Sequence, residues 1–273
     1  MDFFGKTVYC CKNRFAFSEG VSITGCICPI LSAEEGQINE TIWRRLHMVT
    51  DDKRIRIITG HYGSGKTEFS VNYIKKLRES VEGKVAIADL DIVNVYFRSR
   101  EKKAEMEEMG IQVIASNLDT AVADVPAVSG AMTMPVQNKE YQYLIDLGGN
   151  DVGTLVLGRI KPVIDHTETD FFMVVNAYRP GTSTPEGIME QMEILEYAAG
   201  MKVTGFINNT NLVRETTWDC LLHGDEVLKE VTKRTGVPVK YVAFVKELLT
   251  EDVPEGLSGE LFPMEFNMRK TWM

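Results

Sequence analysis

From residue 54 onward, apolar and polar positions follow two patterns that alternate along the chain. Short runs that are apolar along most of their length indicate buried strands, whereas apolar residues at spacings of three and four indicate one face of a helix. The first pattern predicts strands at residues 54–59, 84–90, 111–115, 141–147, 170–176, 202–208 and 237–245. The second pattern predicts helices from residue 65 and at residues 100–109, 185–199 and 218–235.

This alternation is typical of an α/β fold, in which a mostly parallel β-sheet carries helices on both faces. In such a sheet the crossovers are right-handed, and ligands bind at the carboxyl ends of the strands. We therefore expect the polar residues and the glycine that end or follow the predicted strands to lie together at the carboxyl ends of the strands. These residues are Gly60, Asp89, Asp91, Asp146, Asn176 and Asn208.

The same patterns divide the chain into three parts. Residues 1–50 show no sustained period apart from a candidate short helix at residues 40–46, so a poorly structured N-terminal extension is expected. Residues 51–250 contain all the alternating elements and form the predicted domain. Residues 251–273 are expected to be a C-terminal tail.

Composition and charge narrow the class of protein. The 273 residues are 44% hydrophobic and 25% charged, as in an ordinary globular protein. The chain has no apolar run of about 18 residues and no signal-peptide pattern, so we expect no membrane span and a cytoplasmic location. The formal net charge of −9 argues against non-specific binding to nucleic acid, which depends on lysine and arginine.

Four of the five cysteines lie within the N-terminal extension, at Cys10, Cys11, Cys26 and Cys28. Thiolates bind zinc and iron–sulfur clusters. However, Cys-Cys and Cys-x-Cys pairs differ from the Cys-x₂-Cys spacing of common zinc motifs. We therefore favour the alternative, a set of reduced thiols without a metal.

One segment carries a motif in which each part has a physical reason. Residues 60–67 read Gly-His-Tyr-Gly-Ser-Gly-Lys-Thr, a Walker A pattern between a predicted strand and a predicted helix. Its glycines let backbone N–H groups surround a phosphate, and the helix directs its positive end at the same point. Lys66 is expected to reach the β- and γ-phosphates of ATP, and the Thr67 hydroxyl to bind Mg²⁺. The expected nucleotide-binding residues of this loop are Gly60, Gly63, Ser64, Gly65, Lys66 and Thr67.

A second candidate metal ligand ends the strand predicted at residues 141–147. Asp146 has the place of a Walker B carboxylate, which holds Mg²⁺ through water. Gly149 completes an Asp-x-x-Gly pattern, whose backbone N–H could contact the γ-phosphate. The alternative is an aspartate that only caps the next helix. The apolar strand downstream of a P-loop favours the Walker B interpretation.

Two further carboxylates, Asp89 and Asp91, end the second predicted strand. Alternation along a strand places them on the same side of the chain. One would orient or deprotonate the attacking water, and the other would support the Mg²⁺ shell. Solvated turn residues are the alternative, because aspartate is common in turns.

Together these motifs resemble a known family. The P-loop, Asp-Leu-Asp at residues 89–91 and Tyr-Leu-Ile-Asp-Leu-Gly-Gly-Asn at residues 143–150 are similar to the MinD/ParA/Mrp group of SIMIBI-type P-loop ATPases. Their domain is also known as the CobQ/CobB/MinD/ParA-like nucleotide-binding domain. The resemblance covers residues 53–245 and is specific for the superfamily rather than for one member.

The resemblance implies a three-layer P-loop fold and a Mg²⁺-dependent ATPase whose nucleotide switches a conformation or a dimer. It assigns phosphate and metal contacts to Lys66 and Thr67, water activation to Asp91, and the Walker B role to Asp146. The family's signature lysine is replaced by His61, which puts a face-to-face homodimer in doubt.

Two questions remain: which residue replaces the signature lysine, and which base the loop at residues 208–212 favours. Arg98 and Arg100 could replace the signature lysine, or they could begin a solvated helix. Related GTPases read guanine with an aspartate at the position where this chain has Leu212. The amide of Asn208 could instead pair with adenine, so ATP is favoured over GTP.

Four functions remain in competition. The leading one is an ATPase switch that acts on an unknown protein partner. The second is a small-molecule kinase or amidoligase of the CobB-like type, which needs a substrate pocket. The third, an iron–sulfur carrier of the Mrp type, needs a Cys-x-x-Cys pair in the C-terminal half, where only Cys220 occurs. The fourth, a DNA-partitioning ParA, is disfavoured by the acidic charge.

Overall fold

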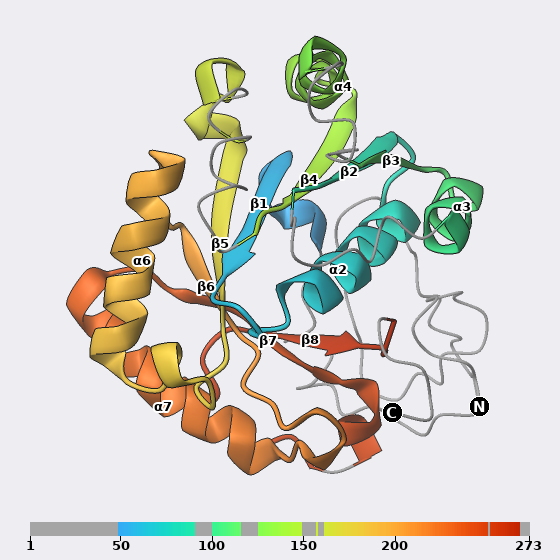
Figure 1. Cartoon of the computed structure of the whole chain (residues 1–273). Coiled ribbons are helices and arrows are strands. Elements are labelled where there is room, and N and C mark those ends of the chain that lie inside the picture. The colour runs from blue at the N-terminus through green and yellow to red at the C-terminus, as the bar shows by residue number, and fades with distance from the viewer. Residues whose placement is uncertain are drawn as a thin grey trace, which may run out of the picture. The chain divides into compact units, whose positions relative to one another are not determined.

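The computed structural model describes residues 49–90, 100–115, 125–148, 157, 161–250 and 252–267. Within this part of the chain, eight parallel strands form one sheet in the order β3-β2-β4-β1-β5-β6-β7-β8 (Figure 1). The strands are β1 (Ile55–Gly60), β2 (Lys84–Asp89), β3 (Ile111–Ala115), β4 (Tyr141–Asp146), β5 (Thr169–Val175), β6 (Gly205–Asn208), β7 (Val239–Val245) and β8 (Glu260–Met264). The predicted α/β class is confirmed.

The described ranges also contain helices of two kinds. The α-helices are α2 (Lys66–Ser80), α3 (Arg100–Glu108), α4 (Val125–Gln137), α6 (Pro185–Ala199) and α7 (Trp218–Thr235). Short 3₁₀ helices are η1 (Val49–Asp51), η4 (Lys161–Val163), η5 (His166–Glu168), η6 (Pro180–Thr182), η7 (Val213–Glu215) and η8 (Lys246–Thr250). No helix in the described ranges is long and apolar enough to cross a membrane.

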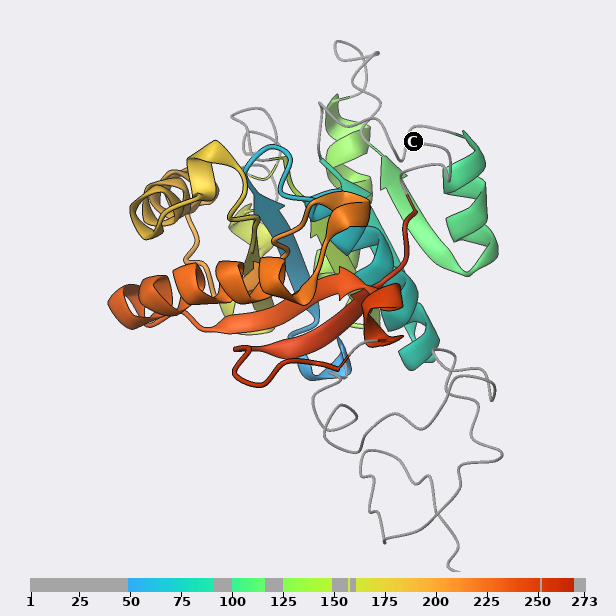
Figure 2. The ribbon, with the colours of Figure 1, turned by 90° about the horizontal axis from the view of Figure 1, so that it is seen from below.

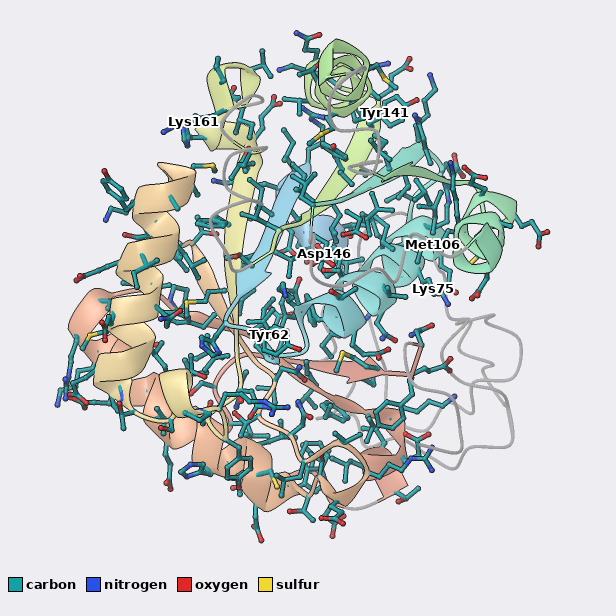
Figure 3. All side chains as sticks on the ribbon, viewed as in Figure 1. Tyr62, Lys75, Met106, Tyr141, Asp146 and Lys161 are labelled. Atoms are coloured by element: carbon teal, nitrogen blue, oxygen red, sulfur yellow. The ribbon has the colours of Figure 1, made fainter. Side chains whose placement is uncertain are left out.

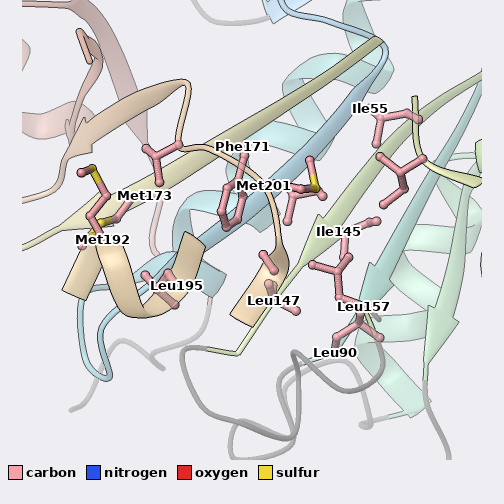
Figure 4. Packing of buried hydrophobic residues seen from close by; sticks show 14 of the residues in the cluster. Ile55, Leu90, Ile145, Leu147, Leu157, Phe171, Met173, Met192, Leu195 and Met201 are labelled. Atoms are coloured by element: carbon pink, nitrogen blue, oxygen red, sulfur yellow. The ribbon is translucent and has the colours of Figure 1, made fainter. Parts of the chain in front are cut away.

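The sheet is buried on both faces, as the apolar strands predicted. In β5, Phe171 and Met173 pack with α4, α6 and α7, whereas the alternate residues Phe172 and Val174 pack with α2 and α3. Figure 4 shows part of the first cluster, where Met192 and Leu195 of α6 lie over the strands. Because neither face is left open, functional side chains are confined to the ends of the strands.

Local sequence signals set the ends of the helices. Thr184 caps α6 by accepting a hydrogen bond from Gly187 N at 3.2 Å, and Pro185 begins the helix. Gly200 and Gly236 end α6 and α7 with φ values of 63° and 77°. Both helices therefore span the residues predicted from the sequence.

The structure differs from the expectation in two elements. Helix α4 contains Pro135 and Gly130, and such helix breakers hide a helical pattern in a sequence. Strand β8 pairs with β7 within the stretch that we expected to be a tail. Pro263 lowers the strand signal there, and it is tolerated because β8 is the edge strand of the sheet.

Candidate functional site

The loop between β1 and α2 has a backbone that only glycine adopts readily at two positions. Gly63 and Gly65 have φ values of 75° and 86°. A Cβ atom on Gly65 would lie 2.3 Å from Nδ2 of Asn209, and one on Gly60 would lie 2.5 Å from the carbonyl oxygen of Val174. The glycines of the motif are therefore required by both conformation and space.

Two side chains from neighbouring loops hold this loop from outside. Asn209, just after β6, donates from Nδ2 to the carbonyl oxygen of Ser64 at 2.7 Å. Arg179, in the loop after β5, donates from Nε to the carbonyl oxygen of Gly63 at 3.0 Å. The C=O and N–H of a trans peptide point in opposite directions, so the N–H of Gly65 points away from Asn209.

The first turn of α2 presents buried polar groups to the inside of the loop. Lys66 is 6% exposed and Thr67 is 3% exposed. Gly65 occupies the N-cap without a side-chain cap, so the amino end of the helix is left to bind an anion. The hydroxyl of Ser64 is buried and has no hydrogen-bond partner in the described part of the chain. This arrangement suits a bound phosphate.

Two carboxylates lie at the ends of the adjacent strands β2 and β4, and β4 pairs with the strand that leads into this loop. Asp89 of β2 and Asp146 of β4 are paired in register, and Asp146 is also level with Ile58 of β1. Asp146 is fully buried and accepts a hydrogen bond at 3.1 Å from the hydroxyl of Ser70, on α2. Figure 3 labels Asp146 at the end of β4 and Tyr62 on the neighbouring loop. The two aspartates thus lie together at the carboxyl ends of the strands, as the sequence predicted.

The oxygen groups at this edge fit Mg²⁺. A hydroxyl, a carboxylate and substrate phosphates are the ligands that this ion prefers, and Thr67 and Asp146 would supply the first two. Across the described ranges, no group of three or more histidine, cysteine or acidic side chains forms a metal cluster.

Asn208 has a different environment from the one expected of a base-reading residue. Its side chain is fully buried, donates to the carbonyl oxygen of Leu221 at 2.8 Å and accepts from Thr210 N at 3.2 Å. The first of these bonds joins the end of β6 to α7. A contact between Asn208 and a base stays a prediction.

Beside the loop lies a small hollow of about 100 Å³. Its polar side is formed by the loop glycines, Arg179 and Asn209, and its apolar side by residues that follow or end β6, β7 and β8. The apolar residues are Val213, Phe244, Val245, Met264 and Phe266. A larger and shallower hollow of about 790 Å³ lies at the amino ends of β2 and β4, away from this site.

His61, in the place of the signature lysine, packs against the loop after β5. Its Nδ1 lies 3.0 Å from the carbonyl oxygen of Tyr62, and a Cβ on Gly181 would lie 2.8 Å from its Nε2. The ring of Tyr178, in the same loop, stacks on His223 at 5.3 Å. Burial and a hydrogen bond with Cys220 raise the pKa of Tyr178.

Several predicted residues lie outside the described residues. They are Asp91, Gly149, Arg98 and the four cysteines of the N-terminal extension. Conversely, the structure adds Ser70, Arg179, Asn209 and Phe266 to the surroundings of the loop. Arg179 and Asn209 had a usable sequence signal, since each lies in a segment that directly follows a predicted strand.

Comparisons with known proteins agree on the fold. Neither a protein family model nor a curated protein matches this sequence. Cell division protein FtsY from Thermotoga maritima is 20% identical with a TM-score of 0.50, over 77% of this chain and 70% of that chain. Chloroplast FtsY from Physcomitrella patens is 18% identical with a TM-score of 0.48, over 82% and 67% of the two chains.

A nucleotide-binding protein from Archaeoglobus fulgidus, solved in complex with ADP, is 17% identical with a TM-score of 0.43, over 72% of this chain and 85% of that chain. The chain spans 58% and 61% of two FtsY chains from Mycoplasma mycoides. At such identities the likeness concerns the fold alone. The chain has the α/β fold of the P-loop NTPases.

Proposed function

We propose that this protein binds ATP with Mg²⁺ at residues 60–67 and hydrolyses it, as a switch that acts on a protein partner. The observation that carries the proposal is the glycine loop with its buried Lys66 and Thr67, set beside the strand-end carboxylate of Asp146. This is the arrangement that a triphosphate and its metal require. The motifs also support membership of the MinD/ParA-like group.

Each residue has a separate task in this proposal. The loop N–H groups and the Lys66 ammonium hold the β- and γ-phosphates and stabilise charge that develops on them. Thr67 and Asp146 would hold Mg²⁺, which supplies neutralisation of the phosphate oxygens. Asp91 would orient the attacking water, Asp89 would support the Mg²⁺ shell, and Gly149 would contact the γ-phosphate.

We infer that adenine is preferred over guanine. The base would enter the hollow beside Asn209 and Phe244, next to the loop that follows β6. That loop has Leu212, 47% exposed, where a guanine-reading carboxylate would stand. The missing charge-assisted hydrogen bonds should cost GTP roughly 2–4 kcal/mol relative to a true guanine site.

The surface around the loop favours a protein partner over a small-molecule substrate. Tyr62 is 72% exposed and Tyr178 is 41% exposed, and exposed aromatic residues are enriched at protein interfaces. A kinase or amidoligase is therefore the second candidate, and a nucleotide-dependent homodimer is one form that the switch could take.

Calorimetric titration and phosphate release test the proposal. The intact protein should bind ATP more tightly than GTP in the presence of Mg²⁺ and should release phosphate from ATP. Lys66→Ala should weaken ATP binding and abolish hydrolysis, because the ammonium meets the phosphates in both the ground and transition states. The matched control is Lys233→Ala, which removes an 80% exposed lysine from the last turn of α7. Equal loss in both variants, or tighter binding of GTP, would overturn the assignment.

A further inference from the structure

The segment that follows β8, residues 265–267, is tied to helix α2 by side-chain hydrogen bonds. Asn72 accepts from Glu265 N at 2.8 Å and donates to the carbonyl oxygen of Glu265 at 2.9 Å. Asn267 N donates to Glu68 at 2.5 Å, and Lys75 donates to the side-chain oxygen of Asn267 at 2.7 Å. Figure 2 shows this end of the chain running past α2. We name residues 265–267 the C-terminal latch.

The latch places an aromatic ring at the hollow beside the P-loop. Phe266 lines that hollow and is 38% exposed, whereas Leu261 and Phe262 in the preceding strand β8 are fully buried. Gly65, Glu68 and Asn209 line the same hollow. A hollow lined by both an aromatic ring and a side-chain amide suits a flat heterocycle that carries polar atoms on its edge.

One helix connects the latch with the phosphate-binding residues. Lys66 and Thr67 are in the first turn of α2, and Glu68, which accepts the hydrogen bond from Asn267 N, is the next residue. Asn72 lies one turn further along the same helix. The helix that carries the phosphate-binding residues therefore also holds the latch.

We propose that Phe266 stacks on the base of the bound nucleotide, and that the latch and the nucleotide stabilise each other. The ligand class is a nucleoside triphosphate with an aromatic base, so the inference rests on the function proposed above. Reciprocity is required by linkage: if the docked latch tightens nucleotide binding, then bound nucleotide favours the docked latch by the same factor. Phe266 thus adds a base-binding residue from outside the motifs.

The first experiment compares ATP with inorganic tripolyphosphate, which carries the charge but no base. Phe266→Ala should weaken ATP binding by about 5- to 100-fold, the range for losing one stacking partner, and leave tripolyphosphate binding unchanged. Phe266→Tyr should restore the affinity for ATP, because it retains the ring. The control is Tyr197→Ala, which removes a 92% exposed ring from α6.

The second experiment weakens the latch without touching the hollow. Asn72→Ala removes two hydrogen bonds to the backbone of Glu265. It should weaken ATP binding several-fold through the undocked latch, with tripolyphosphate binding unchanged. In the full chain, hydrogen exchange of residues 265–267 should slow when ATP is added, but not when tripolyphosphate is added.

The outcomes separate this inference from the proposed function. If Phe266→Ala binds ATP like the unchanged protein, or loses ATP and tripolyphosphate equally, Phe266 does not contact the base. If ATP does not slow the hydrogen exchange of residues 265–267, the latch and the nucleotide do not stabilise each other. If the unchanged protein binds neither ligand, the nucleotide site itself is wrong, and the proposal on the latch falls with it.

Discussion

The backbone at Gly65 shows how one residue shapes the candidate site. Its φ of 86° is in the left-handed region, and the Asn209 amide occupies the space that a Cβ atom would need. The same amide holds the carbonyl oxygen of Ser64. A side chain at Gly65 would therefore strain the backbone and also displace the residue that orients the loop.

Gly65→Ala should reduce stability and ATP binding together. The left-handed backbone costs alanine about 1–2 kcal/mol, and loss of the Asn209–Ser64 hydrogen bond adds about 1 kcal/mol. Gly236→Ala is the matched control, because Gly236 has a similar φ of 77° but no atom within 4 Å of an added Cβ. Urea unfolding should show the smaller cost for Gly236→Ala, and calorimetry should show weaker ATP binding only for Gly65→Ala. Equal ATP affinity in both variants would contradict this role of the loop.

Substitution of Asp91 should lower the rate of ATP hydrolysis without lowering the affinity for ATP. Asp91→Asn keeps the shape of the side chain and removes a negative charge near the triphosphate, so ATP affinity should be kept or increased. Turnover should fall roughly 100-fold or more, as expected for the loss of a positioned base. Steady-state phosphate release and calorimetry measure the two effects. If Asp91→Asn hydrolyses ATP at the unchanged rate, Asp91 is a turn residue, and Asp89→Asn becomes the variant to test.

Among the secondary structure elements, β8 has the clearest effect on the site. Its Phe262 is fully buried, and its ring lies 4.8 Å from that of Phe69 and 6.0 Å from that of Tyr73, both on α2. The edge strand therefore supports the helix that carries Lys66 and Thr67. Residues 260–264 are part of the sheet and connect the candidate site to the latch.

Phe262→Ala should destabilise the protein by about 3–5 kcal/mol, because it leaves a cavity between the sheet and α2. Phe266→Ala is its counterpart, since it removes the same atoms from a ring that is 38% exposed. Chemical unfolding should therefore show a much larger loss for Phe262→Ala than for Phe266→Ala. Similar losses would mean that β8 and the latch have the same structural role.

At the scale of the whole molecule, the first described residues, 49–52, are held by the buried guanidinium of Arg56. Arg56 in β1 is fully buried, and its Nη2 donates to the carbonyl oxygens of Val49 at 3.1 Å and Asp52 at 3.0 Å. Tyr73 of α2 donates to the Asp52 carboxylate at 2.6 Å. Burial, together with this carboxylate, raises the pKa of Tyr73. Residues 49–52 therefore complete the domain, although no strand includes them.

A chain that begins at Met48 should fold and bind ATP like the full chain, because residues 1–47 add no motif to the site. A chain that begins at Arg54 is the control. It lacks Val49 and Asp52, and loss of their two carbonyl acceptors from the buried Arg56 should cost about 3–6 kcal/mol, because hydrogen bonds to charged groups contribute about 1.5–3 kcal/mol each. Thermal unfolding and calorimetry distinguish the two chains. Loss of ATP affinity in the Met48 chain, or stoichiometric zinc or iron on the N-terminal cysteines of the full chain, would contradict the prediction.

The sequence alone determined the features whose signals are local. In the described ranges, periods of apolar residues placed every strand except β8 and every α-helix except α4, and Thr184, Gly200 and Gly236 set the ends of α6 and α7. The order of strand, glycine loop and helix identified the P-loop. Asp89 and Asp146 could be assigned to one edge because parallel strands end on the same side of their sheet.

Only the tertiary structure decided which residues meet across distant parts of the chain. Asn208 is held by Leu221 and Thr210, and its neighbour Asn209 contacts the P-loop instead. This choice depends on the direction of each side chain after β6, which no periodicity specifies. The latch lies 199 residues from its partner Glu68. Contacts of that kind arise from packing between distant segments, and packing leaves no pattern in the neighbouring sequence.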